Sequence, residues 1–175
     1  MWIGRGTEAD LGPIVKILNG VVATSIAIFD THPTSVAARR AWFEQFAEAG
    51  PYQLLVARQD NTVIGYAASQ RYRDHDAFRE TVEVSVALHA GYRSRGVGSA
   101  LYKALFDRLA GEPVHVAVAG IAMPNDASVA LHRKFGFTEV GTFREYAVKN
   151  GRYISALWMQ RLAPSGDTAD RLDHQ

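Results

Sequence analysis

The sequence of 175 residues contains no cysteine. Disulfide bonds, thiolate metal sites and a cysteine nucleophile are therefore excluded, so no acyl group can pass through a cysteine acyl-enzyme. An excess of charge is also missing, because 19 Lys and Arg residues against 18 Asp and Glu residues leave a formal net charge of +1. Such a balance gives no general attraction to nucleic acid or to a membrane surface. Any basic patch must therefore act locally.

Long apolar runs, internal repeats and low-complexity segments are absent as well. No run approaches the roughly 18 apolar residues of a membrane span, and residues 1–5 lack the apolar core of a secretory signal. We therefore expect a cytoplasmic protein. Hydrophobic residues at 47% and charged residues at 21% are typical of an ordinary globular domain. We expect one domain over residues 1–163 and a loose tail over residues 164–175.

The spacing of apolar residues predicts helices and strands in a mixed order. Strand patterns cover residues 2–6, 53–58, 62–71, 81–88, 114–119, 137–148 and 152–162. Helical spacing favours a helix after a capping box at residues 7–10, and further helices over residues 36–49, 98–109 and 125–135. Asn150 and Gly151 are the strongest hairpin signal. This order predicts an α/β or α+β domain built on a mixed sheet.

A basic, glycine-containing turn joins the strand over residues 81–88 to the helix that follows. It consists of Arg93, Ser94, Arg95, Gly96, Val97, Gly98 and Ser99. Glycine lets the backbone approach a ligand closely, the first amides of a helix have no partner within it, and the helix dipole favours negative charge at this end. The two arginines add charge-assisted donors. The turn therefore predicts a pocket for a phosphate-bearing cofactor.

Two other interpretations of the glycine motifs do not fit the surrounding sequence. A Walker loop requires a lysine after its last glycine, whereas Gly96 is followed by Val97. Gly4 and Gly6 resemble part of a dinucleotide fingerprint, but Gly4 lies within the first strand and the elements after it do not build a parallel nucleotide-binding unit. An ordinary helix start with solvated arginines remains the alternative to the phosphate pocket.

Three segments together resemble the signature of the GCN5-related N-acetyltransferases (GNAT). They are Arg93-x-x-Gly96-x-Gly98 between strand and helix, Asn125 at the start of a later helix, and residues 131–137. Through residues 65–67, 81–86, 125–128 and 149–151, the chain is similar more narrowly to the phosphinothricin and methionine sulfoximine N-acetyltransferases. The resemblance covers residues 2–162. It implies acetyl-CoA as co-substrate and a twisted mixed sheet of about seven strands flanked by about four helices.

The resemblance implies catalytic roles for two residues in acetyl transfer to an amine. A base has to deprotonate the amine, and the expelled thiolate finally needs a proton. The base is placed at Glu83, two residues from Ser85 on the same strand face; the alternative is a carboxylate paired with a nearby arginine. The acid is placed at His132, as a protonated imidazole or as a neutral ring that orders a water. No histidine pair has a metal-ligand spacing, so no metal is expected.

Cofactor contacts are expected to be mostly main-chain contacts. In the implied fold, the pantetheine arm lies like an added strand against Val86, Ala87 and Leu88. A main-chain N–H such as that of Leu88 would serve the oxyanion. Asn125 would hydrogen-bond the arm, cap its own helix, or do both.

The acceptor pocket is less well determined by the sequence. Arg73 matches a basic position of the phosphinothricin-type enzymes and would hold a substrate carboxylate, with a solvated loop arginine as the alternative. Phe78 matches an aromatic position beside the substrate. Tyr153 and Ser155 depart from the residues of some relatives, so the polarity of the pocket is expected to differ. We expect a small amino acid or analogue as acceptor and leave its identity open.

Two other functions would use the same cofactor-binding residues. A peptide or protein N-terminal acetyltransferase would need an open groove, and a CoA-binding sensor would lack turnover. Glu83 and His132 argue against the sensor, and closure around Arg73 and Phe78 would separate the two enzymes. Relatives of this type are commonly homodimers. The aromatic residues within 42–46 would serve either such an interface or core packing.

Overall fold

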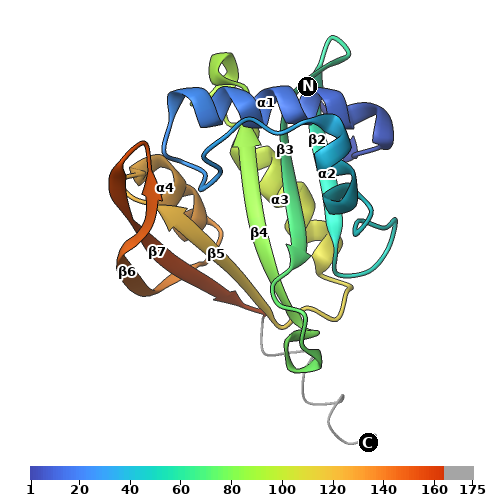
Figure 1. Cartoon of the computed structure of the whole chain (residues 1–175). Coiled ribbons are helices and arrows are strands. Elements are labelled where there is room, and N and C mark those ends of the chain that lie inside the picture. Colours follow the sequence, from blue (N-terminus) through green and yellow to red (C-terminus); the bar gives the residue numbers. More distant parts are fainter. Residues whose placement is uncertain (164–175) are drawn as a thin grey trace, which may run out of the picture.

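A seven-stranded mixed sheet forms the centre of the chain in a computed structural model that describes residues 1–163 (Figure 1). The strands are β1 (Trp2–Arg5), β2 (Gln53–Gln59), β3 (Thr62–Arg71), β4 (Thr81–Leu88), β5 (Val116–Ala122), β6 (Thr138–Lys149) and β7 (Arg152–Leu162). The helices are α1 (Leu11–Thr24), α2 (Val36–Phe43), α3 (Val97–Leu109) and α4 (Asp126–Lys134). The predicted fold class is confirmed. The expected tail over residues 164–175 lies outside the described residues.

Two neighbouring strands in the middle of the sheet separate along their length. The sheet order is β1-β2-β3-β4-β5-β7-β6, in which β4 and β5 run parallel and the other neighbours run antiparallel. The parallel pairing joins Thr81, Val82 and Glu83 of β4 to residues 116–118 of β5. Beyond that point the strands diverge, as Figure 1 shows. The divergence leaves one edge of β4 open from residue 84 onward.

Helices cover both faces of the sheet, and strand alternation assigns each residue of β4 to one of them. Val82 and Val84 belong to the core cluster under α3. Ala87 belongs to a second cluster, under α1. Glu83 and Ser85 alternate with Val82 and Val84, so they face the side that carries α1 and α2. Within residues 1–163, no helix combines the length and the apolar character that crossing a membrane requires.

The aromatic residues of α2 and the segment after it pack against the sheet. Trp42, Phe43 and Phe46 contact the second core cluster. The Trp42 ring lies edge-on to the rings of Phe46 and Tyr66, with centroid distances of 4.7 and 5.9 Å. Of the two uses expected for these aromatic residues, the structure supports core packing.

Helix α2 ends at Phe43, well before the predicted end at residue 49. The main chain turns here, because the Phe46 N–H donates to the Phe43 carbonyl (3.1 Å) and the Ala47 N–H donates to the Tyr52 carbonyl (3.2 Å). This turn brings Phe46 onto the core. The sequence places the stop at Gly50 and Pro51 because it does not show this long-range contact.

Strand β5 covers residues 116–122 instead of the predicted 114–119. The His115 and Val116 N–H groups both donate to the Glu80 carbonyl, at 2.9 and 3.1 Å, and regular pairing starts only after this junction. The hairpin between β6 and β7 follows the prediction. Asn150 and Gly151 both have a left-handed backbone, with φ of 52° and 71°.

Candidate active site

The turn between β4 and α3 has the backbone of an anion-binding loop. Ser94 and Gly96 have φ of 59° and 77°, and Gly96 directly precedes the helix. The first intrahelical bond runs from the Ala100 N–H to the Gly96 carbonyl (3.0 Å). The amides of residues 97–99 therefore precede that bond and have no carbonyl one turn back. Arg93 and Arg95 are exposed beside them, so this end of α3 suits a phosphate group.

Lys134 is a third cation at this turn, and the sequence reasoning missed it. Its Nζ donates to the Ser99 Oγ at 3.1 Å, which ties the end of α4 to the first turn of α3. The positive end of the α3 dipole and the three cationic side chains lie in one region. Lys134 stands within the segment 131–137 that carried the resemblance, but only the packing of α4 against α3 reveals its partner.

The open edge of β4 presents main-chain donors toward β5. The His89 N–H donates to the Ile64 carbonyl of β3 at 2.9 Å. Successive N–H groups of a strand point toward opposite edges of that strand. The N–H groups of Leu88 and Val86 therefore point away from β3, into the space between the diverging strands. This geometry supports the expected main-chain site for an extended amide-containing arm.

Asn125 caps α4. Its Oδ1 accepts a hydrogen bond from the Ser128 N–H at 3.2 Å. One of its two expected roles is thus observed, and the contact with the cofactor arm stays a prediction.

Glu83 is the last residue of β4 that pairs with β5, and the two strands diverge after it. Partial burial raises the pKa of its carboxyl above the ordinary value of 4.5, and a hydrogen bond from the Gln70 side chain opposes that rise. Gln70 stands opposite Glu83 on β3, and its Oε1 accepts from the Trp42 indole N–H at 2.9 Å. Among the residues that the structure describes, no ion pair includes Glu83. The alternative of an arginine-paired carboxylate therefore has no support.

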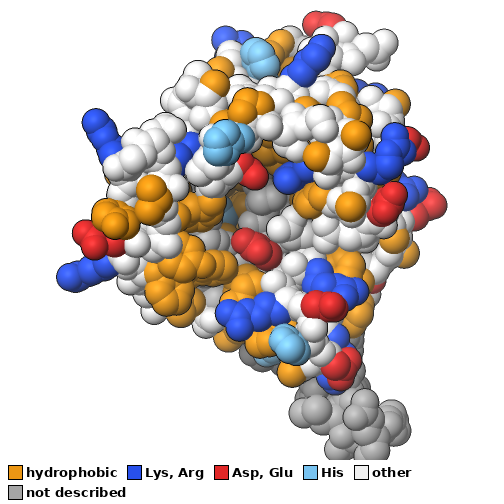
Figure 2. All heavy atoms as spheres, viewed as in Figure 1, with side chains coloured by type: hydrophobic (Ala, Val, Ile, Leu, Met, Phe, Trp, Pro, Cys, Tyr) orange, Lys and Arg blue, Asp and Glu red, His pale blue; other side chains and the backbone are white. Residues whose placement is uncertain are grey.

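A cleft of about 920 Å³ opens over Glu83. Its walls are the segment between α1 and α2, one side of α2, and Gln70 with Glu83 on the sheet; the lining residues are Phe29, Asp30, Thr31, His32, Pro33, Thr34, Ser35, Ala38, Arg39, Trp42, Gln70 and Glu83. Figure 2 shows this side of the molecule hollowed near its centre, with charged side chains of both signs around the opening. The cleft is large enough for a small amino acid.

Lys149 holds the segment that forms one wall of the cleft. This lysine is buried, and its Nζ donates to the carbonyls of Ser25 and Ile28 at 2.8 and 3.0 Å. A cation here also complements the carboxyl end of α1. The sequence singled out Lys149 only as part of a matching motif, because its partners lie more than a hundred positions away in the chain.

Arg73 and Phe78 come together below the end of β3. The Arg73 guanidinium carbon lies 5.6 Å from the centre of the Phe78 ring and 5.1 Å from that of Tyr72. Neither Arg73 nor Phe78 lines the cleft over Glu83. Their contact with an acceptor stays a prediction.

His132 is buried, with 3% of its surface exposed. Its Nδ1 lies 2.7 Å from the Ser128 carbonyl, so Nδ1 carries the hydrogen, and its Nε2 then accepts from the Tyr102 hydroxyl at 2.9 Å. Burial lowers the pKa of the imidazole. The hydrogen bond to Ser128 opposes this shift, but burial is the larger effect, so the neutral ring, which was one of the two forms expected, is favoured.

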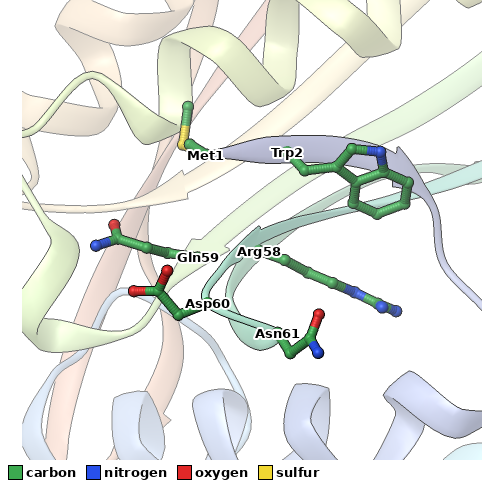
Figure 3. A pocket seen from close by; sticks show the side chains of 6 residues that line it. All are labelled: Met1, Trp2, Arg58, Gln59, Asp60 and Asn61. Atoms are coloured by element: carbon green, nitrogen blue, oxygen red, sulfur yellow. The ribbon is translucent and has the colours of Figure 1, made fainter.

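A second pocket, of about 580 Å³, lies at the β1 edge of the sheet and is shown in Figure 3. Met1, Trp2, Arg58, Gln59, Asp60 and Asn61 line it. Arg58 is paired with the buried Asp10 and lies over the Trp2 ring, so its charge is already engaged in the fold. None of the predicted site residues contributes to this pocket. Among residues 1–163, no group of three or more potential metal-binding side chains occurs.

Comparison with known proteins gives matches along most of the chain. The model described as Acetyltransferase (GNAT) family matches residues 23–137. A phosphinothricin N-acetyltransferase of Streptomyces coelicolor is 44% identical over 158 residues, which are 89% of this chain and 92% of that protein. An L-methionine sulfoximine/L-methionine sulfone acetyltransferase of Pseudomonas aeruginosa is 39% identical and covers 87% of this chain and 88% of its own. The crystal structure of a GNAT superfamily phosphinothricin acetyltransferase from Sinorhizobium meliloti with acetyl-CoA has a TM-score of 0.88 at 30% identity, covering 95% of this chain and 90% of that chain.

Proposed function

The chain belongs to the acetyltransferase (GNAT) family, and from this premise we propose that it transfers an acetyl group from acetyl-CoA directly to the primary amine of a small amino acid of the phosphinothricin or methionine sulfoximine type. The names of the relatives at 44% and 39% identity support this acceptor class. The observation that carries the proposal is the position of Glu83. This carboxylate lies where β4 and β5 diverge, between the cleft and the open strand edge.

The proposed donor site follows β4 from its open edge to the turn before α3. Residues 93–99 and Lys134 would hold the pyrophosphate. The main chain of Val86, Ala87 and Leu88 would lie along the pantetheine arm and pair with it through the N–H groups of Val86 and Leu88. Asn125 would contact the arm from its other side. The structures of two similar proteins, from Sinorhizobium meliloti and Salmonella typhimurium, contain acetyl-CoA, which supports acetyl-CoA as the donor.

The proposed acceptor site supplies the base. Glu83 would take a proton from the ammonium group, directly or through water, and the freed nitrogen lone pair would form the new C–N bond at the thioester carbonyl. The Leu88 N–H would donate to the oxyanion, and the C–S bond would then break with its electron pair on sulfur. The surplus proton on the new amide nitrogen would pass through water to this sulfur, so that the products are the amide and the CoA thiol. A carboxyl with a raised pKa is a better base than an ordinary one.

His132 would act at the leaving thiolate as a neutral ring. Its Nδ1–H is engaged by the Ser128 carbonyl and its Nε2 by the Tyr102 hydroxyl, so we infer that it acts by holding these two groups in place and not by giving up a proton of its own. Ser85, on the same sheet face as Glu83, would contact the acceptor. Arg73 and Phe78, near the end of β3, would also contact it.

Release of the CoA thiol across a panel of acceptors tests the function. The panel contains free amino acids, phosphinothricin, methionine sulfoximine, simple amines and short peptides, with mass spectrometry to identify the acetylated product. We expect the highest kcat/KM with the amino acid analogues. Higher values with peptides would favour a peptide N-terminal acetyltransferase, and no thiol release with any acceptor would favour a CoA-binding sensor.

We also infer that the protein is a homodimer that associates through β6. The strand is last in the sheet order, so within residues 1–163 its outer edge has no strand partner. Large apolar side chains on β6 and β7 are 51–70% exposed, namely Val140, Phe143, Tyr146, Val148 and Tyr153. Such a patch on a free edge favours self-association. Light scattering should give twice the chain mass of 19.2 kDa; a mass of one chain would contradict the inference.

A further inference from the structure

Residues 25–35 join α1 to α2 and form the wall segment of the cleft over Glu83; residues 29–35 of this segment line the cleft. The segment belongs to no helix or strand. Within residues 1–163, no hydrogen bond between main-chain groups involves residues 26–34. A segment without such bonds is ordered only by contacts with the rest of the fold. Its conformation at the cleft therefore depends on side chains that reach it from other elements.

Lys149, the last residue of β6, holds the start of the wall segment. Its side chain is buried, and its Nζ donates to the Ser25 and Ile28 carbonyls at 2.8 and 3.0 Å. In Figure 1 the turn between β6 and β7 lies beside the chain that leaves α1. No ion pair among residues 1–163 includes Lys149. Its charge-assisted hydrogen bonds therefore go to neutral carbonyls of the wall segment.

Two further contacts fix the wall segment. The Phe29 ring lies edge-on to the Tyr146 ring of β6, with 6.0 Å between the centroids. Near the other end of the segment, Asn19 of α1 pairs with the main chain of Thr34. The Asn19 Nδ2 donates to the Thr34 carbonyl, and the Thr34 N–H donates to the Asn19 Oδ1, both at 2.9 Å. Polar side chains thus hold both ends of the segment, and an aromatic contact holds its middle.

Fold stability alone does not explain a lysine at position 149. Burial of a cation away from water is costly, and apolar residues of similar volume often replace buried charged groups without loss of stability. An apolar side chain cannot fix the direction of two carbonyl groups. The hydrogen bonds from Lys149 set the path of the chain as it leaves α1. They therefore also set where Phe29 and the residues after it join the cleft lining.

We propose that Lys149 is a positioning residue for the acceptor. It holds the wall segment in the shape that the acceptor meets, while Glu83 stands on the floor of the same cleft. Lys149 is not among the lining residues, so it acts through the segment and not by contact. A wall that is ordered before binding reduces the entropy lost when the acceptor binds. This assignment rests on the proposed function and adds a residue that sets acceptor affinity.

Lys149→Met tests the assignment, because methionine has a similar length but neither the charge nor the donors. L-methionine sulfoximine and phosphinothricin serve as acceptors. We expect the acceptor KM to rise about tenfold, since apparent affinity falls with the fraction of molecules whose wall segment is in place. The KM for acetyl-CoA should stay unchanged, because its proposed site contains no residue of the segment. Chymotrypsin should cut after Phe29 faster in the variant, which mass spectrometry measures without any need for activity.

The absence of native cysteine allows a chemical rescue. Lys149→Cys introduces the only thiol of the chain. Alkylation of this thiol with 2-bromoethylamine in denaturant, followed by refolding, places an ammonium group at nearly the distance that lysine gives it. The aminoethylated protein should have the acceptor KM of a parent taken through the same treatment. The unmodified Lys149→Cys protein should keep a raised acceptor KM.

Two matched variants separate positioning from a general loss of stability. Asn19→Ala releases the other end of the wall segment and should also raise the acceptor KM. Asp10→Asn weakens the pairing of Asp10 with Arg58 near the β1 edge. It should lower the melting temperature while both KM values stay unchanged. A smaller folded fraction lowers the apparent kcat with every acceptor and leaves KM unaltered, so the KM values distinguish the two roles.

Lys149→Met with the acceptor KM of the parent overturns this assignment alone. Where that variant does not fold, an unchanged acceptor KM in Asn19→Ala does the same. Aminoethylation that leaves the acceptor KM of Lys149→Cys raised also overturns it. A parent that acetylates neither L-methionine sulfoximine nor phosphinothricin overturns the proposed function, and this assignment with it.

Discussion

Glu83→Gln is expected to lower turnover about 100- to 10 000-fold at neutral pH, the usual contribution of a general base. Glutamine has nearly the same shape and can still hydrogen-bond to Gln70, but it cannot accept the proton of the amine. The turn over residues 93–99 follows the other end of β4, so acetyl-CoA affinity should change little. Steady-state kinetics and calorimetry measure the two quantities. Equal turnover in variant and parent would exclude Glu83 as the base.

The pH profile of the parent provides an independent check. Burial raises the pKa of Glu83, so kcat/KM should fall with decreasing pH at a point above the ordinary value for a glutamate. Glu83→Gln should lack this acid limb. Glu48→Gln, which changes an exposed carboxylate paired loosely with Arg5, is the control and should retain both the activity and the limb.

Glu83→Gln is expected to raise the free energy of unfolding at neutral pH. The pKa of Glu83 is higher in the folded protein than in the unfolded chain, so ionisation favours unfolding as pH rises from the unfolded-state pKa through the folded-state pKa. Glutamine cannot ionise, so the variant does not lose this stability. The difference in stability between variant and parent should vanish below about pH 4, where Glu83 is protonated in both the folded and the unfolded state. Thermal unfolding at the two pH values measures the difference. A variant that is less stable at neutral pH would contradict the burial cost.

Gly96→Val is expected to weaken acetyl-CoA binding at least about a hundredfold, which corresponds to the loss of one or two hydrogen bonds to a charged group. Gly96 has φ of 77°, where a β-branched residue is strained. A Cβ at this position meets no protein atom within 4 Å, so the fold itself does not exclude the side chain. The expected loss comes from displacing the amides of residues 97–99 and from filling space beside them.

Gly50→Val is the matched control for this substitution. Gly50 also has a positive φ, of 101°, and open space around its Cβ, but it lies in the loop before β2. It should show a similar loss of stability and normal acetyl-CoA binding. Calorimetric titration of both variants makes the comparison, and unchanged binding by Gly96→Val would refute the phosphate-binding role of the turn.

Local patterns predicted much of the fold because their causes are local. Alternating apolar residues marked β4, and its period of two places Glu83 and Ser85 on one face. Asn150 and Gly151 predicted the β6–β7 turn through their tolerance of positive φ. The end of α2 was misplaced, because helix propensity continues past Phe43 while packing of Phe46 on the core ends the helix.

The sequence by itself determined the fold class, the basic glycine-containing turn over residues 93–99 and the position of Glu83 on its strand, because these depend on neighbouring residues. Only the tertiary structure decided which distant residues share a site. Arg39 and Glu83 line one cleft, Lys149 reaches the segment after α1, and burial against Tyr102 favours a neutral His132. Desolvation and long-range contact arise when the helices pack on the sheet, so no local pattern carries them.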